Sequence, residues 1–309
     1  MSLRHKARPR RRALSLIELT ITVGLLGVLA GLTLSAVQRS RDAAARVRCQ
    51  NSLKQLATAL HNHHAAHGRL PPLTDLPTLR SLSVTQQPEA LLSWMAQILP
   101  YVERDDLWRQ SVMACAADRL PYHNPPHIGY ATPVAAFVCP SDDRLLRPMT
   151  PASGHTAAFH SYPGVEGAYD SRGLLPGVLS AWQGIRLSDV NDGTANTLMV
   201  GERPPPDSLQ AGRWYSSLHI LERFGGNDVL LAINEPMPWA QDEECARALH
   251  AFGPGVTDNP CDRYHFWSLH AGGANFAFAD GSVRFLPYTA RSVMVALASR
   301  DGGETVEIP

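Results

Sequence analysis

Three residues near the C-terminal end, Ser268, His270 and Asp280, are of the types that act as nucleophile, base and orienting carboxylate in hydrolases. No Gly-x-Ser-x-Gly turn or other nucleophile motif surrounds Ser268. Asp280 is followed by Gly281, and an Asp-Gly pair between two apolar runs is typical of a tight hairpin turn. The sequence therefore predicts that the protein is not an enzyme and that His270 is a structural residue that anchors this hairpin.

A group of histidines is spaced so that some pairs could bind a metal from one face of a helix: His61, His63, His64 and His67. The same residues lie near the expected C-terminal end of that helix, where an imidazolium cation interacts favourably with the helix dipole. We favour this second interpretation and assign no metal to the group.

Acidic and amide side chains precede a glycine in an arrangement similar to a calcium-binding loop: Asp189, Asn191, Asp192 and Gly193. The EF-hand pattern needs Asp or Asn at its fifth position and Glu at its twelfth, where this sequence has Gly193 and Val200. The segment is therefore predicted to form a turn, and no cofactor is expected. Calcium accepts irregular sets of oxygen ligands, so a site built from Asp192 or Asp280 with backbone carbonyls is the alternative.

The cysteines are too few for a disulfide-rich scaffold: Cys49, Cys115, Cys139, Cys245 and Cys261. No C-x-x-C spacing occurs among them, so a zinc site is not expected. Their odd number leaves at least one thiol free, and one or two disulfides are expected in an oxidising compartment.

The charges are distributed unevenly along the 309 residues, although 28 basic and 28 acidic residues give a net charge of zero. The first 13 residues contain six cations and no acid: Arg4, Lys6, Arg8, Arg10, Arg11 and Arg12. The remaining chain has 22 basic and 28 acidic residues, a net charge of −6. Phosphate contacts require clustered Lys and Arg, so nucleic acid is not expected as a partner.

Residues 14–37 form an apolar run of 24 residues with one charge, Glu18. A membrane-spanning helix needs roughly 20 apolar residues, whereas the apolar part of a secretory signal peptide has about 7–15. The basic leader predicts a cytoplasmic N-terminus by the positive-inside rule, although four arginines also follow the run. We expect a single-pass inner-membrane protein with a periplasmic or cell-surface head. A plain uncleaved signal anchor is the alternative.

The segment Ala13-Leu14-Ser15-Leu16-Ile17-Glu18-Leu19 resembles the cleavage and methylation motif of type IV prepilins, with Ala and Leu where Gly and Phe are usual. This resemblance implies a basic leader over residues 1–13 and cleavage between Ala13 and Leu14 by a prepilin peptidase. It also implies N-methylation of Leu14 and a role for Glu18 in subunit assembly.

The helix is predicted to continue beyond the membrane to residue 67. Cys49, Leu53, Leu56 and Leu60 are spaced to form one apolar stripe, and Gly68 is followed by two prolines that stop a helix. Residues 14–67 are thus one helix, transmembrane over about 14–37, and residues 68–309 are the extracytoplasmic head. Two disulfides are predicted. Cys49 with Cys139 would join the helix to the head, and Cys245 with Cys261 would close a shorter surface loop.

The head is predicted to be rich in β structure, which gives an α+β protein with the long helix packed on an antiparallel sheet. The clearest element is a hairpin over residues 274–286 with a type I′ turn at Asp280-Gly281 and one buried face on each strand. The other expected elements are a short helix (88–100), strands (134–139 and 197–200), surface loops (144–180 and 202–212), and a final helix capped by Thr289 and ended by Gly302 and Gly303.

Several segments are similar to a pilin-like family of unknown biochemical role that carries a C-terminal H-x9-D-G box. The box is His270, nine residues, then Asp280 and Gly281, within the hairpin region 270–286. The other matching segments occur in the family's order: residues 49–55, 137–142 and 192–198. Together these motifs span residues 14–303.

The two resemblances imply a structural subunit of a type IV pilus-like filament or a type II secretion pseudopilus, a pilin or pseudopilin. Its partners would be other pilin-like subunits, the prepilin peptidase and methylase, and the membrane. The alternative is a membrane-anchored extracytoplasmic binding protein that does not polymerise, such as one that binds glycan.

Overall fold

The computed structural model describes residues 16–73, 88–180, 183–216, 229–238, 240, 242–304 and 306–307. The chain divides into two compact units, residues 1–44 and 45–309. The predicted leader, with Ala13 and Leu14, lies outside the described residues.

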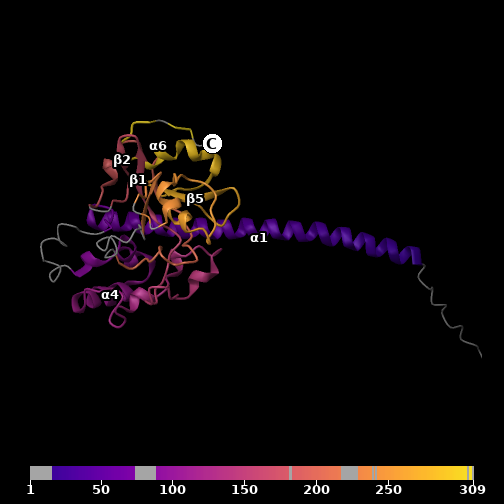
Figure 1. Ribbon diagram of the computed structural model, residues 1–309, viewed down its shortest axis with the longest axis horizontal. Coiled ribbons are helices and arrows are strands. Elements are labelled where there is room, and N and C mark those ends of the chain that lie inside the picture. Colours follow the sequence, from indigo (N-terminus) through magenta and orange to yellow (C-terminus); the bar gives the residue numbers. More distant parts are fainter. Residues whose placement is uncertain are drawn as a thin grey trace, which may run out of the picture. The chain divides into compact units, whose positions relative to one another are not determined.

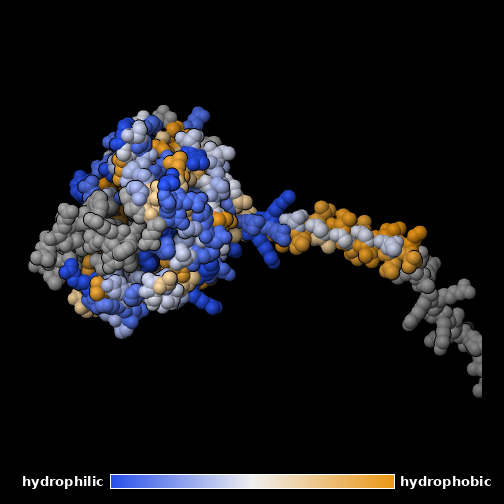
Figure 2. Space-filling view, viewed as in Figure 1, coloured by the Kyte–Doolittle hydropathy of each residue, from blue (hydrophilic) through white to orange (hydrophobic). Residues whose placement is uncertain are grey.

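Helix α1, Leu16–His67, is a single uninterrupted helix of 52 residues that begins in the first unit and ends in the second. In the first unit its large apolar side chains are exposed, among them Leu16, Leu25, Leu32 and Val37, and Figure 2 colours this segment mostly hydrophobic. It is long and apolar enough to span a membrane. The helix ends as predicted, because Gly68 takes a positive φ of 72° and donates its N–H to the His64 carbonyl.

The part of α1 in the second unit is a core element of the head. Cys49, Leu53, Leu56 and Leu60, the predicted stripe, are all completely buried. Burying one such leucine stabilises a fold by about 1.5–3 kcal/mol. Within this unit α4 and α6 lie on opposite sides of α1 (Figure 1), and Leu107 and Cys115 of α4 pack in the same core as the stripe.

The sheet has six strands: β1 Gly164–Asp170, β2 Gly173–Pro176, β3 Leu198–Gly201, β4 Leu230–Ile233, β5 Gly273–Phe278 and β6 Val283–Pro287. Its order is β2-β1-β3-β5-β6, with β4 paired to β1. All pairs are antiparallel except β1 with β4, which is parallel. The predicted α+β class and the packing of the helix on the sheet are confirmed, with β4 as a parallel addition.

Both faces of β5 are buried, whereas the sequence predicted one buried face. Phe276 and Phe278 pack in a core with α6, and Ala277 packs in the core that contains the α1 stripe. Small side chains therefore face the helix and allow it to approach the sheet closely, while the large aromatic rings fill the opposite layer.

The remaining helices are short: η2 Pro88–Leu91, α3 Trp94–Gln97, η3 Leu99–Val102, α4 Asp105–Ala117, η4 Ile128–Ala131, η5 Ala135–Phe137, η6 Asp143–Leu146, η7 Leu187–Asp189, α5 Glu243–Arg247, η9 Pro260–Tyr264, η10 Tyr288–Val293 and α6 Met294–Ala298. The helix predicted over 88–100 is thus three separate turns, η2, α3 and η3. The final helix also differs, because Thr289 lies inside η10 and α6 ends before Ser299.

The strand predicted over residues 134–139 is wrong. Residues Ala135–Phe137 form the 3-10 turn η5, closed by a hydrogen bond from the Val138 N–H to the Ala135 carbonyl. The segment is instead attached to Ser161, whose N–H donates to the Phe137 carbonyl and whose hydroxyl accepts from the Cys139 N–H. The strand predicted over residues 197–200 is confirmed as β3, displaced by one residue.

The surface loops predicted over 144–180 and 202–212 are wrong in part. The first contains β1 and β2, and Gly167 in β1 has a φ of 142° and so little space that a Cβ would lie 2.0 Å from the Leu175 carbonyl oxygen. A glycine here permits close strand pairing and does not mark a loop. In the second segment, residues 202–206 are buried.

The β5–β6 hairpin is confirmed, but its turn is not of type I′. A type I′ turn needs positive φ at both central residues, and only Gly281 has one, of 80°. Asp280 instead accepts a hydrogen bond on its carboxylate from the Ser282 N–H, 2.8 Å away. The Asp side chain therefore shapes this turn through a local hydrogen bond.

His63 is expected to make the head less stable in acid. Burial and the neighbouring His67 lower the pKa of its imidazole from 6.5 to about 4. Above pH ~6.5 the ring is neutral in the folded and unfolded chain, and below it only the unfolded chain gains the proton. The free energy of unfolding should fall by about 1.4 kcal/mol per pH unit, up to about 3 kcal/mol near pH 4. The expectation that His63 is an imidazolium cation that interacts with the helix dipole is therefore wrong.

Urea unfolding at about pH 7 and about pH 4 measures this loss. Burial also lowers the pKa of three other histidines, His61, His127 and His250. The contribution of His63 must therefore be isolated with a variant. His63→Gln should reduce the loss, while His155→Gln at an exposed site should leave it unchanged. Equal losses in wild type and His63→Gln would contradict the assignment.

Candidate functional site

Glu18 lies in the first turn of α1, with an exposed side chain. It is the only charged residue in the segment from residue 14 to residue 37. The hydroxyl of Thr22 donates to backbone carbonyls of the preceding turn, including that of Leu19 at 3.1 Å, so the nearby polar side chain is satisfied within the helix. Because Ala13 and Leu14 lie outside the described residues, the cleavage point stays a prediction.

Two disulfides are present, and they are the two predicted pairs. Cys49 of α1 is joined to Cys139 after η5, with their Cα atoms 5.0 Å apart. Cys245 is joined to Cys261, with Cα atoms 5.1 Å apart. Cys115 is free and buried.

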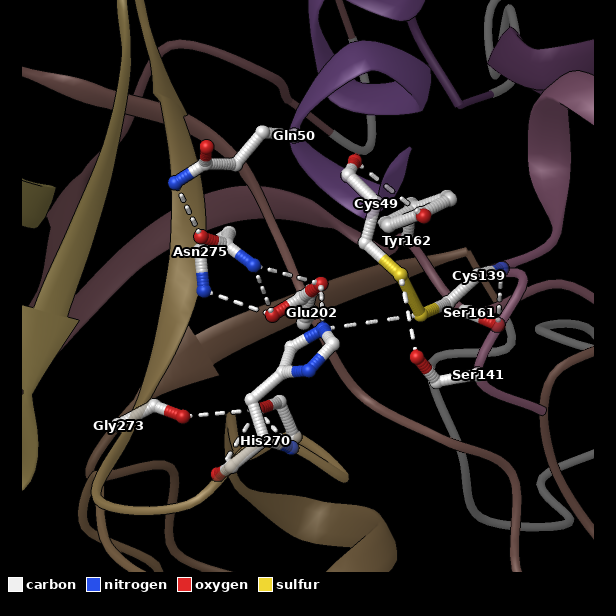
Figure 3. Close-up of a disulfide and its surroundings, with 11 residues drawn as sticks. Cys49, Gln50, Cys139, Ser141, Ser161, Tyr162, Glu202, His270, Gly273 and Asn275 are labelled. Carbon is white, nitrogen blue, oxygen red and sulfur yellow. Dashed lines mark hydrogen bonds and ion pairs between the residues drawn. A yellow bond between two sulfur atoms is a disulfide. The ribbon is translucent and has the colours of Figure 1, made fainter. Parts of the chain in front are cut away.

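His270 contacts the first disulfide and a buried carboxylate (Figure 3). Its Nε2 lies 3.9 Å from the Sγ atom of Cys139 and 3.4 Å from Oε1 of Glu202. The side chains of His270 and Glu202 are only 7% and 2% exposed. A carboxylate in such a place must be hydrogen-bonded or paired, because burying an isolated charge is costly.

Asn275 of β5 holds Glu202 in place. Its backbone N–H donates to Oε2 at 2.7 Å, and its side-chain Nδ2 lies 3.1 and 3.0 Å from the two carboxylate oxygens. Its Oδ1 accepts from the Gln50 amide of α1 at 3.0 Å. Burial and the Glu202 charge raise the pKa of nearby Tyr162 well above its ordinary value. The result is a buried polar network between helix and sheet (Figure 3).

The two ends of the H-x9-D-G segment contact α1 at different places. His270 precedes β5 beside the Cys49–Cys139 disulfide, while the Gly281 carbonyl after β5 accepts from the Lys54 Nζ at 2.7 Å. Nine residues separate His270 from Asp280, and the six of them that form β5 span about 20 Å. They therefore do not form a nucleophile-activating pair, and both ends of the segment hold the hairpin against the helix.

Ser268 has a structural role as well. Its hydroxyl donates to the Gly273 carbonyl at 2.7 Å and accepts from the His270 N–H at 3.0 Å. These bonds close the turn that leads into β5 and fix the position of His270.

The segment that resembled a calcium loop binds the C-terminal tail. Both carboxylate oxygens of Asp192 accept backbone N–H groups, from Gly302 at 2.7 Å and Gly303 at 2.8 Å. Asn191 donates to Asp301 at 2.8 Å. The predicted turn thus fastens the chain after α6, and the two glycines are used here and do not end a helix.

Two histidines of α1, His63 and His64, each have a backbone partner of their own. The Nδ1 of His63 lies 3.0 Å from the Arg69 carbonyl, and Nε2 of His64 accepts from the Leu187 N–H at 3.2 Å. Among the described residues, a different group of side chains is close enough in space to hold a metal ion. It consists of Cys49, Cys139, Glu202 and His270. The sequence did not indicate Glu202 as a site residue, because it lies in a Pro-rich segment and belongs to no local motif.

Fold and site together define an α+β protein whose sheet is fastened to a single N-terminal helix by a buried disulfide and a polar network. The chain belongs to the family described as Protein of unknown function (DUF1559), because the family model SBP_bac_10 matches residues 38–291. The match covers the second part of α1 and most of the head, and the apolar segment 14–37 precedes it. Comparison with curated proteins and with solved structures gave no match.

Proposed function

We propose that the protein is a type IV pilin-like or pseudopilin subunit that enters a filament through its N-terminal helix. The observation that carries the proposal is the exposed apolar segment of α1 with a single carboxylate, Glu18, in its first turn. Such a segment needs lipid or other apolar helices around it, because its side chains bury nothing within the chain. In the filament these helices bundle, and the heads form the outer surface.

The same features support the proposed location and partners. The six cations before the segment favour a cytoplasmic N-terminus, which places the head outside the membrane. Two disulfides suit a head that folds in an oxidising compartment. The partners are other pilin-like subunits and the prepilin peptidase and methylase. No catalysis is assigned to the head, since Ser268, His270 and Asp280 serve structural contacts.

Processing gives the direct test of this proposal. The mature chain extracted from membranes should begin at a methylated Leu14, because the basic leader is followed by Glu18 at the fifth position of the apolar run. N-terminal mass spectrometry measures this. The control is the variant Ala13→Glu, which leaves Glu18 in place. Its added charge at the cleavage point should prevent cleavage, so that the leader stays attached. If wild type carries only the uncut Met1 terminus, the protein is instead a signal-anchored binding protein that does not polymerise.

A further inference from the structure

Four side chains from distant parts of the chain bring metal-ligand atoms together inside the head. The Sγ atoms of Cys49 and Cys139, a carboxylate oxygen of Glu202 and a ring nitrogen of His270 all lie within 4.8 Å of one another. All four residues are buried. We propose that this group is a zinc site when the Cys49–Cys139 disulfide is reduced, so that the head has two alternative forms, a disulfide and a zinc dithiolate.

The distances between the ligand atoms suit a tetrahedral zinc ion. Zinc bonds of about 2.0–2.3 Å to sulfur, nitrogen and oxygen place neighbouring ligand atoms about 3.3–3.8 Å apart in a tetrahedron. The distance from His270 Nε2 to Glu202 Oε1 is 3.4 Å, and from His270 Nε2 to Cys139 Sγ it is 3.9 Å. With Cα atoms 5.0 Å apart, the two cysteines can reach one ion by rotating their side chains once the covalent bond between them is broken.

The ligand types select the metal. Two thiolates and an imidazole are soft or borderline ligands that favour zinc over magnesium or calcium, and one carboxylate completes a four-coordinate set. Two thiolates and the carboxylate carry three negative charges, which the dication largely offsets in a buried place. Calcium, considered from the sequence at Asp192 or Asp280, would instead require several oxygen ligands.

A second layer of hydrogen bonds holds the ligands in position. Asn275 fixes the Glu202 carboxylate through its backbone N–H and side-chain amide, and Gln50 in turn fixes Asn275. The Cys139 N–H donates to the Ser161 hydroxyl at 3.0 Å. Outer contacts of this kind orient metal ligands, and their loss typically reduces metal affinity about 10–100-fold.

The conversion balances with a thiol reductant. Two thiols of a small dithiol or of a thioredoxin-like protein give two electrons and two protons to the Cys49–Cys139 bond. This produces two cysteine thiols and the disulfide of the reductant. Zinc then binds the two cysteine sulfurs, and their two protons pass to solvent. His270 coordinates as the neutral ring through Nε2, and Glu202 as the carboxylate.

The full-length chain in detergent provides the test, with cobalt(II) as a spectroscopic probe for zinc. After reduction by a water-soluble phosphine and removal of the reductant without oxygen, one equivalent of cobalt should give thiolate charge-transfer bands and the visible bands of a tetrahedral ion. Added zinc should abolish both. The oxidised chain should show neither. His270→Ala and Glu202→Gln should each weaken binding by more than about 100-fold, and Asn275→Ala by about 10–100-fold.

The second disulfide supplies the matched control. Cys245→Ser with Cys261→Ser should keep the cobalt spectrum, and Cys49→Ser with Cys139→Ser should lose it. Binding unaffected by His270→Ala and Glu202→Gln would overturn the site, as would a reduced wild-type chain that binds no cobalt. If reduction unfolds the head, zinc must restore the folded circular dichroism spectrum, and failure to do so also overturns it. Every ligand lies in the unit of residues 45–309, so the result is independent of filament assembly.

Discussion

Glu18→Ala is expected to leave a folded, membrane-inserted protein that no longer enters filaments. In the proposed filament, cleavage after Ala13 creates an ammonium group on Leu14 at the membrane depth of Glu18. The amine of a neighbouring subunit, shifted along the filament axis, can then approach this carboxylate. Deleting one partner of a buried charge pair costs roughly 3–5 kcal/mol, which is enough to prevent docking through a marginal contact.

Immunogold electron microscopy of sheared cell-surface material, with an antibody to the head, measures the filaments. Glu18→Gln keeps the shape of the side chain and removes its charge, so it should also fail. Thr22→Ala changes a nearby polar residue whose hydroxyl bonds lie within the helix, and it should assemble normally. If Glu18→Ala forms as many filaments as the wild type, the charge pair is not required for assembly.

Removing the Cys49–Cys139 disulfide should destabilise the oxidised head more than removing Cys245–Cys261. The paired residues are 90 apart in the first case and 16 apart in the second. In the chain-entropy model the longer loop contributes about 4–5 kcal/mol and the shorter about 3 kcal/mol. The first bond also joins α1 to the segment beside β5, so its loss should loosen the helix from the sheet.

Urea unfolding of the two serine double variants in detergent, without metal, compares the losses. The fluorescence of the buried tryptophans reports the transition: Trp94, Trp214 and Trp267. A larger loss from the shorter loop would mean that local contacts around Cys245 outweigh the entropy of the longer loop.

The long-range connection between helix and head could be predicted because it follows from local periodicity. The spacing of Cys49, Leu53, Leu56 and Leu60 defines one helix face, and a face that is entirely apolar must be covered. Cys49 lies on that face, so its partner is expected in the head, and Cys139 follows an apolar run there. The pairing holds although the run is a 3-10 turn, because burial, and not strand geometry, places the cysteine there.

Residues whose role depends on tertiary neighbours could not be predicted. Gly164 and Gly167 are typical of loops, yet they lie in β1, where close strands leave no space for a Cβ. Glu202 follows β3 in a Pro-rich segment, and only the approach of Asn275 and His270 explains a buried carboxylate there. The group of Cys49, Cys139, Glu202 and His270 has no sequence spacing to identify it, because four separate segments contribute one residue each.

The contacts of α1 with β5 and β6 have a consequence for how the head is made. Gln50 and Asn275 are 225 residues apart, and Lys54 and Gly281 are 227 apart. A topology that depends on such distant pairings has a high contact order and folds slowly, because a long loop must close before its contacts form. During synthesis the apolar stripe of α1 therefore emerges long before the strands that cover it. Until β5 and β6 have been made and have folded beside it, the chain exposes an apolar helix face that must be shielded from aggregation.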